Sequence, residues 1–469
     1  MVVLHSFQEV FDASAKTTAL SLPTHKESVL KVEFGSCKGN KTQFNGSEPP
    51  LPFAASDVFH SKIVGWRRLT ANDKECKAVY EVTLDIKGSD LSYKPGDTIG
   101  IIPRNNKSEV DFLLNHLNLM PVADVWYNLS IASENSSKIK IPAHIPVSST
   151  IRHVLMHCVD LRTVVKKLFL LGLSRHTKDE SERKVLEYLC SKEGSSAYTT
   201  HILNSNTCLL DLLANFKSCK PTVEILFQNL TRLLPRPYSI ANSYLKDPNV
   251  IKICFSVMDI GNNRKGLTTG WIENIILNQE NTLEDAFRNL SVKDNQSIPI
   301  YLRKNMNSFE LPETIDSPLI LIGPGTGVAP FIGFLEQMEY LQSSQEESFN
   351  TWLFFGCRHP KLDFLYKEEL KGFLETKILS NLEVAFSRCE NSEIKYVQDA
   401  IMNNGEQIVK LIKEGSRIFV CGDLKTMAAQ VKDAIVKCLV QYDDRTIEEA
   451  EKFICDLQKD KLYIVDIWN

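Results

Sequence analysis

The sequence lacks the features of membrane, secreted and nucleic-acid-binding proteins. Nowhere do eighteen apolar residues follow one another, so no membrane-spanning helix is predicted. The segment that starts at Met1 has no charged stretch followed by an apolar core, as a secretory signal would. A net charge of −4 gives no general basic field for nucleic acid or an anionic membrane. We therefore expect a cytoplasmic protein, with neither nucleic acid nor membrane among its partners.

Cysteine is present but shows no pattern. The twelve cysteines include no pair at the C-x-x-C spacing, so neither a zinc site nor a disulfide framework is indicated. Most are expected to be small buried apolar side chains. Four histidines in the middle of the chain have no carboxylate or cysteine at ligand spacing, and no metal site is predicted. They are His153, His157, His176 and His201.

The chain is long and apolar enough for two or three domains, with 469 residues of which 43% are hydrophobic. Apolar residues first recur at every second position, as in strands, then at every third or fourth position, as in helices, and then again at every second position. After that, strand and helix patterns alternate. This predicts a multidomain fold, α/β plus all-β. We interpret 1–56 as a linker or arm, 57–104 and 223–312 as two parts of an antiparallel barrel, 105–222 as a helical insertion, and 313–469 as a doubly wound parallel sheet.

A glycine-rich turn opens the C-terminal part. Residues 323–327, Gly-Pro-Gly-Thr-Gly, lie between the apolar strand 319–322 and the helical stretch 329–342. The glycines let the backbone approach a diphosphate, and the first helical N–H groups attract its charge. A tight turn that binds nothing has the same pattern. Further strands are expected at 351–356, 382–387 and 417–421, and further helices at 363–375, 396–413, 424–440 and 446–458.

Two segments of the barrel region suit a nucleotide that carries an aromatic ring. In the run 236–239, Arg236 and Tyr238 share one face, so a guanidinium can meet phosphate while a phenol packs on a ring. The Ser239 hydroxyl is then free for a ring heteroatom. The alternative is an edge strand with a solvated arginine. In the run 264–272, Thr269 is a plausible N-cap of a helix that either receives phosphate or is simply capped.

Basic residues stand where a dinucleotide-binding unit usually has an acidic residue for a ribose hydroxyl. Arg358 follows the second strand of the expected sheet, and Arg388 and Lys395 follow the third. Such a cluster suits a 2′-phosphate, and hence NADP rather than NAD, unless it is a solvated basic rim. Beyond the next strand, Cys421 and Asp423 occupy the switch point at which such sheets bind ligands. The thiol there either contacts a nicotinamide or is an inert buried cysteine.

As an ordered set, these motifs resemble the ferredoxin-NADP reductase-like half of the diflavin reductases, a family that includes cytochrome P450 reductase. The resemblance covers residues 57 to 469, and within the family it is strongest to members that serve the cobalamin-dependent methionine synthase. The set comprises Tyr93-x-Pro95-Gly96-Asp97, Arg236-Pro237-Tyr238-Ser239, Gly323-Pro324-Gly325-Thr326-Gly327, Phe355-Gly356-Cys357-Arg358, Ser387-Arg388, Cys421-Gly422-Asp423 and Asp466-Ile467-Trp468.

The resemblance implies FAD in the barrel and NADPH on the C-terminal domain. Residues implied to bind FAD are Arg236, Tyr238, Ser239, Gly266, Thr268, Thr269 and Trp468. Those implied for NADPH are Gly325, Thr326, Arg358, Ser387, Arg388, Lys395, Tyr396, Gln398 and Asp423. Catalytic roles along the hydride path are implied for Ser239, Cys421, Asp466 and Trp468, the last of which would stack on the flavin until nicotinamide displaces it. Thr268 stands where the family often has cysteine.

The family also has an N-terminal FMN-binding flavodoxin domain, and nothing before residue 57 resembles it. FMN is therefore expected only through a domain or partner outside this chain. The resemblance implies that electrons pass from NADPH through FAD toward the cobalamin-dependent methionine synthase or a flavodoxin-like electron carrier. Two alternatives stay open: a diflavin-type reductase for a haem or sulfite reductase acceptor, and a non-catalytic partner of the cobalamin enzyme.

Overall fold

The computed structural model describes residues 7–24, 28–35, 41–132, 140–260, 264–286, 297–342, 349–390, 392–422 and 425–467. The chain divides into two compact units. The first contains Met1–Leu51, Pro103–Pro235 and Asp259–Thr268, and the second contains Pro52–Ile102, Arg236–Met258 and Thr269–Asn469. No helix among the described residues is both long and apolar enough to cross a membrane.

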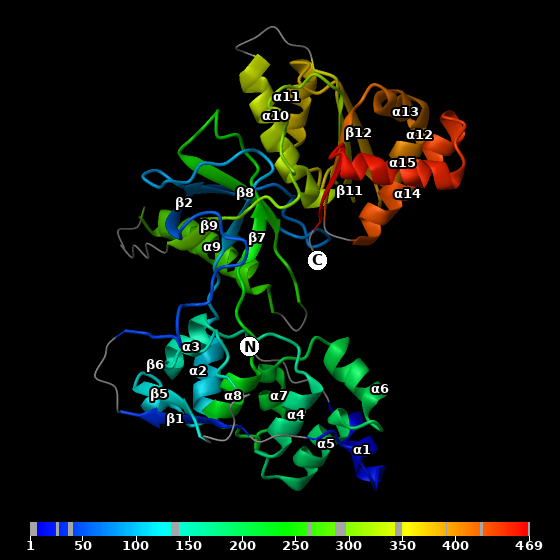
Figure 1. The fold of residues 1–469 in the computed structure, drawn as a ribbon. Helices are drawn as coiled ribbons and strands as arrows, with labels where there is room; N and C mark the ends of the chain where they lie inside the picture. Colours follow the sequence, from blue (N-terminus) through cyan, green and yellow to red (C-terminus); the bar gives the residue numbers. More distant parts are fainter. Residues whose placement is uncertain are drawn as a thin grey trace. The chain divides into compact units, whose positions relative to one another are not determined.

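The first unit is mainly helical and encloses one apolar core, with a small antiparallel sheet in the order β1-β5-β6 (Figure 1). In α5 the apolar side chains recur on one face, where Val185, Leu186 and Leu189 are buried, whereas the residues from Phe169 to Ser174 of α4 are all buried. The elements are α1 (Gln8–Lys16), β1 (Leu30–Phe34), α2 (Lys107–His116), β5 (Trp126–Ile131), β6 (Ser148–Thr150), α3 (Ile151–His157), α4 (Lys167–Ser174), α5 (Glu180–Cys190), α6 (Ser195–Tyr198), α7 (Leu209–Asn215) and α8 (Val223–Asn229), with short helical turns η1 (Met120–Val122) and η2 (Thr199–Leu203).

This unit differs from the sequence interpretation in three places. The segment 1–56, expected to be a linker or arm, contains α1 and β1, and Val10 of α1 is buried in the core. The expected helical insertion also contains β5 and β6. Helix α8, placed by sequence in the second part of the barrel, belongs to the first unit. The strands were missed because β1 pairs with β5, which is remote in sequence. The residues around each strand therefore do not indicate its partner.

The second unit begins with a closed antiparallel barrel, as predicted. Its six strands run in the order β7-β4-β9-β2-β3-β8. The two end strands meet where Ile240 bridges to Ile253, and the Ala241 N–H donates to the Lys252 carbonyl at 2.8 Å. Closure leaves no long unpaired edge. The elements are β2 (Phe59–Arg68), β3 (Val79–Asp85), β4 (Thr98–Ile101), β7 (Arg236–Ser239), β8 (Val250–Ser256), β9 (Ile298–Leu302) and the helix α9 (Leu267–Ala286).

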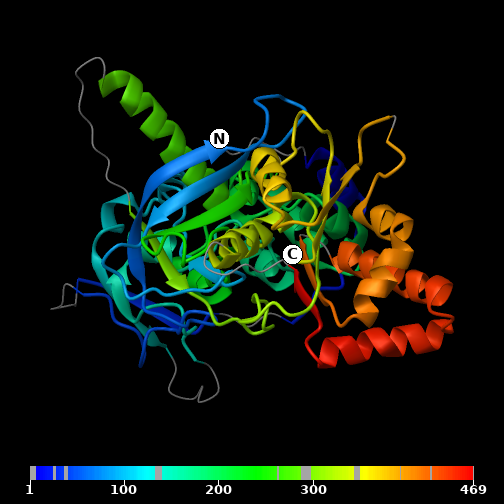
Figure 2. The same cartoon turned by 90° about the horizontal axis from the view of Figure 1, so that it is seen from above.

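A parallel sheet in the order β12-β11-β10-β13-β14 completes the second unit and confirms the predicted doubly wound fold. Alternate residues of β10 face opposite sides: Leu319 and Leu321 pack in one core with α10 and α11, while Ile320 and Ile322 pack in another with α12 to α15. Figure 2 shows the yellow helices on one side and the orange and red helices on the other. The elements are β10 (Leu319–Ile322), η3 (Gly325–Val328), α10 (Ala329–Gln342), β11 (Thr351–Cys357), α11 (Lys367–Glu375), β12 (Asn381–Phe386), α12 (Val397–Asn403), α13 (Gly405–Lys413), β13 (Arg417–Gly422), α14 (Lys425–Tyr442), α15 (Ile447–Lys459) and β14 (Tyr463–Ile467).

The expected helix at 396–413 is two helices, α12 and α13, with Asn404 between them. The break fits a close approach to α14. A Cβ on Gly405 would lie 2.5 Å from the Tyr442 ring and 3.0 Å from the Cys438 sulfur. Because this crowding comes from a helix later in the chain, apolar spacing alone does not reveal it.

Candidate functional site

A pocket of about 420 Å³ lies beyond the carboxyl ends of the parallel strands, the edge at which doubly wound sheets bind nucleotides. It brings together turns that follow β10, β11 and β12 with the first part of α14. Seven of the residues expected to bind NADPH line it, and these are Gly325, Thr326, Arg358, Ser387, Lys395, Tyr396 and Gln398. The eighth, Arg388, is exposed beside it, and Asp423 lies outside the described residues.

The glycine-rich turn is shaped by two different demands on its backbone. At Gly327 a Cβ would lie 2.2 Å from the carbonyl oxygen of Cys421, so only glycine lets the turn approach the end of β13 this closely. Gly325 has a φ of 58°, and no atom of the described part of the chain lies within 4 Å of its Cβ position. Its left-handed backbone therefore favours glycine, while its open side faces the pocket. The pocket and the glycine backbone at its edge, which carries no side chain, together fit a dinucleotide.

The ends of β11 and β12 bring the expected basic residues together. Pairing continues past both strands, because the Ser387 N–H donates to the Cys357 carbonyl and the Arg388 N–H donates to the Arg358 carbonyl, each at 2.9 Å. The turn after β11 is fixed by Asp363, which accepts hydrogen bonds from the backbone N–H of Arg358 at 3.1 Å. The backbone of Arg388 is thus held beside that of Arg358, which lines the pocket.

Lys395 and Tyr396 reach the same pocket from the start of α12. The carboxylate of Asp399 accepts from the backbone N–H of Tyr396 at 2.9 Å and from that of Lys395 at 3.3 Å. This holds the first turn of the helix and leaves both side chains exposed. Lys395 is therefore free to meet a phosphate at the pocket's edge.

Sequence reasoning missed the barrel's part in this pocket. Thr70, Lys77, Val79 and Ser256 line it from the barrel, on and beside β3 and β8. Lys77 lies just before β3, whose first four residues are all buried, and nothing in the local sequence shows that the start of this strand borders the nucleotide pocket. Cys357 also lines the pocket, and burial raises the pKa of its thiol to about 12, so it stays neutral.

The residues expected to hold the flavin ring lie on β7. Arg236 and Tyr238 are both partly buried, while Pro237 between them is exposed, in keeping with the expected shared face. Register with β4 pairs Tyr238 with Ile99 and Ser239 with Thr98. The Tyr238 ring packs edge-on against Phe255, with centroids 6.0 Å apart, so the phenol has a fixed place at the barrel wall.

The start of α9 corrects one expectation. Thr269 is not the N-cap, since the helix begins at Leu267. Instead its hydroxyl oxygen accepts a hydrogen bond from the Met258 N–H at 3.3 Å. The preceding Thr268 is 3% exposed, and its hydroxyl has no hydrogen-bond partner among the residues that the structure describes. A buried unpaired hydroxyl is costly, and one in the first turn of a long helix fits a phosphate oxygen.

Two of the residues expected along the hydride path are neighbours in the parallel sheet. Cys421 on β13 is level with Asp466 on β14, and Cys421 is fully buried. Burial, and secondarily the nearby Asp466, raises the pKa of the Cys421 thiol well above its usual range. Ser239 lies on the barrel strand β7, and Trp468 lies outside the described residues. No group of three or more potential metal ligands gathers among the residues that the structure describes.

Asp466 gives the protein a specific pH dependence. Burial raises the pKa of its carboxyl group above the usual 3.8, with Arg303 opposing. The folded protein therefore holds this proton more tightly than the unfolded chain, and stability declines as the pH rises through the raised pKa. We expect Asp466→Asn to flatten the profile of the unfolding temperature against pH there and to raise that temperature at neutral pH. Exposed Asp460→Asn is the control, and a lower temperature for Asp466→Asn at neutral pH would refute the expectation.

Comparison with known proteins gives matches that include residues of both units. A family described as "FAD binding domain" matches residues 51–271, and one described as "Oxidoreductase NAD-binding domain" matches 321–433. Methionine synthase reductase from Homo sapiens is 37% identical over 492 residues, which cover 100% of this chain and 69% of that protein. The chain belongs to the methionine synthase reductase family.

Other relatives agree with this family assignment. Methionine synthase reductase from Rattus norvegicus is 37% identical over 96% of this chain and 66% of its own length, and that from Bos taurus is 36% identical over 88% and 61%. The chain thus spans less than two thirds of these two relatives. NADPH–cytochrome P450 reductase from Homo sapiens is 31% identical over 94% of this chain and 62% of its own length.

Membership in the methionine synthase reductase family confirms the resemblance on which the sequence interpretation depended. The two matched domains confirm FAD and NADPH as the cofactors and oxidoreductase as the class of protein. The pocket, the bare Gly325 backbone and the unpaired Thr268 hydroxyl are features of this chain that suit those cofactors. The roles of individual side chains remain predictions.

Proposed function

We propose that this chain transfers hydride from NADPH to FAD. The observation that carries the proposal is the pocket of about 420 Å³, in which seven residues expected to bind a phosphorylated dinucleotide meet residues of the FAD-type barrel. When bound, FAD supplies a two-electron acceptor that can release electrons singly. The chain's own task is to hold the two flat cofactors in register and to exclude water.

In this proposal the side chains divide that task. Gly325 and Thr326 admit the diphosphate of NADPH, while Arg358, Arg388 and Lys395 neutralise its phosphates. Tyr238 packs on the flavin ring, and the Thr268 hydroxyl donates to a flavin phosphate. Cys421, Asp466 and Ser239 border the nicotinamide, and Trp468 covers the flavin when nicotinamide is not there.

We further propose that the electrons continue to a cobalamin-dependent methionine synthase, through FMN on another domain or on a flavodoxin-like carrier. Support comes from the relatives named methionine synthase reductase. The 31% identity to NADPH–cytochrome P450 reductase supports a second candidate, delivery to a haem protein. A cytoplasmic location is proposed because the eleven cysteines in the described residues are free thiols, as is usual in a reducing compartment.

The proposal predicts which acceptors the purified chain can reduce. After loading with FAD, it should oxidise NADPH with ferricyanide, which accepts electrons directly from flavin. Cob(II)alamin on methionine synthase should be reduced only when an FMN-bearing flavodoxin is added. Faster electron transfer to a haem protein than to the cobalamin enzyme, with the same carrier present, would favour the second candidate. A chain that shows no flavin spectrum and takes up no added FAD would be a non-catalytic partner instead.

A further inference from the structure

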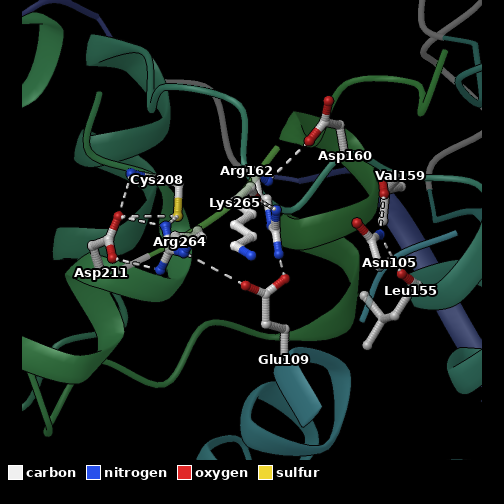
Figure 3. A network of polar contacts seen from close by, with 10 residues as sticks. All are labelled: Asn105, Glu109, Leu155, Val159, Asp160, Arg162, Cys208, Asp211, Arg264 and Lys265. Carbon is white, nitrogen blue, oxygen red and sulfur yellow. Dashed lines mark hydrogen bonds and ion pairs between the residues drawn. The ribbon is translucent and has the colours of Figure 1, made fainter. Parts of the chain in front are cut away.

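A buried network of ion pairs holds the segment 264–266, which leads into α9 (Figure 3). Arg264, in that segment, contacts both carboxylate oxygens of Asp211 on α7: its Nη2 lies 2.8 Å from Oδ1 and its Nη1 lies 3.2 Å from Oδ2. The Nε of Arg264 is 3.5 Å from Oε1 of Glu109, on α2. From the other side, the Nε of Arg162 donates to Oε2 of Glu109 at 3.0 Å. Negative and positive side chains thus alternate along this series of contacts, in the order Asp211, Arg264, Glu109, Arg162.

The four side chains are largely withdrawn from water. Their exposed fractions are 1% for Asp211, 9% for Arg264, 12% for Glu109 and 9% for Arg162. Two cations balance two anions, so no net charge is buried. Groups in such a network are strongly tied to one geometry, because displacing one member leaves another charged and unpaired in a medium of low polarity.

The network fixes the backbone of the segment as well as a side chain. Arg162 Nη1 donates to the carbonyl oxygen of Lys265 at 2.6 Å, and the Arg264 carbonyl accepts from the Ile260 N–H at 3.0 Å. The carbonyl of Lys265 and the guanidinium of Arg264 are therefore held by different partners. With both adjacent residues fixed, Gly266 and the first turn of α9 have a defined starting point.

Stability alone gives little reason for placing such a network here. A buried ion pair is often no more stabilising than apolar side chains of similar volume, and what it adds is a specified geometry. The specified geometry ends one residue before Gly266 and three before Thr268, whose unpaired hydroxyl already fits a phosphate. A rigid preceding segment reduces the entropy that FAD binding must overcome in ordering this turn.

We propose that the network of Asp211, Arg264, Glu109 and Arg162 positions the start of α9 for the FAD diphosphate. Arg264 acts through the backbone that follows it and is a positioning residue with no contact of its own to the flavin. The inference rests on the proposed function, since it requires FAD phosphate at Thr268.

The test measures FAD affinity in equilibrium titrations of the full chain, followed by flavin fluorescence. We expect Arg264→Gln to raise the Kd for FAD at least about tenfold, equivalent to about 1.4 kcal/mol. Arg264→Lys, which keeps the charge but loses the two-pronged contact, should fall between Arg264→Gln and the unaltered chain. Combining Arg264→Gln with Asp211→Asn should cost less than the two separate losses added, because both remove the same contact.

Controls separate positioning from general stability. Arg175→Gln removes a half-exposed arginine of the same unit and should leave the Kd for FAD unchanged. Binding of 2′,5′-ADP, which uses the pocket of the second unit, should be unaltered in every variant. Unfolding temperatures without FAD show whether each variant folds. If Arg264→Gln does not fold, Arg162→Lys tests the same device through the Lys265 carbonyl, with an expected rise in Kd of several-fold.

Two results have distinct meanings. If the unaltered chain binds FAD and the folded variants bind it equally well, even with lower unfolding temperatures, the network is merely structural and the inference is wrong. The proposed function is untouched by that result. If the unaltered chain takes up no FAD, the proposed function itself fails, and the inference fails with it.

Discussion

Replacing Arg388 or Lys395 by alanine should weaken NADPH binding about 10- to 100-fold and leave NADH binding nearly unchanged. Hydrogen bonds to charged groups contribute roughly 1.5–3 kcal/mol, and the 2′-phosphate that they would meet is absent from NADH. Lys395 lines the pocket, and the backbone of Arg388 is bonded to that of Arg358, which also lines it. The measurement is the Kd of each nucleotide by titration of the FAD-loaded chain.

A charge control makes this result specific. Lys371 on α11 is about half exposed and pairs only with Glu368 of its own helix in the contacts described, so Lys371→Ala should change neither nucleotide's Kd. Equal losses for NADPH and NADH in the Arg388 and Lys395 variants would show that these residues do not read the 2′-phosphate. Their cluster would then be a solvated basic rim.

Gly327→Ala should destabilise the second unit by about 1–3 kcal/mol or more. The added Cβ would lie 2.2 Å from the Cys421 carbonyl oxygen and 2.9 Å from its carbon, and neither backbone atom can move without disturbing β13. The turn must therefore retreat from the sheet, which also misplaces Gly325 and Thr326. Chemical denaturation measures the loss, and NADPH titration should show weaker binding in the same variant.

Gly372→Ala is the matched control, because no atom of the described residues lies within 4 Å of its Cβ position on α11. There alanine should stabilise the helix by about 0.5–1 kcal/mol, since glycine loses more backbone freedom on folding. If Gly327→Ala were as stable as Gly372→Ala, the close approach between the turn and β13 would not exist in solution.

The parts of the fold that sequence predicted are those with local signals. The doubly wound sheet was predictable because each strand is a short apolar run followed by a helix. The turn at Gly325 was predictable because it is rich in glycine. The pairing of β1 with β5 was not predictable, because it joins segments far apart in sequence. The position of Lys77 at the pocket was not predictable either, because its neighbours there follow β10, β11 and β12, far along the chain.

The site shows a similar division. Arg358 follows β11, whereas Ser387, Lys395 and Gln398 follow β12. Parallel topology brings the ends of these two strands to one edge, so the pocket was foreseeable. The N-cap prediction at Thr269 was wrong because the helix starts at Leu267, where no side chain marks the beginning. Nothing in the local sequence around Arg264 indicates that its partner is Asp211.

Hydride transfer within the chain is tested most directly by rapid anaerobic mixing of the FAD-loaded protein with NADPH while the flavin absorbance is followed. We expect the oxidised flavin to bleach without any added carrier, and to bleach more slowly when the transferred hydrogen of the nicotinamide is deuterium. A flavin that stays oxidised while NADPH is bound would contradict the proposed function.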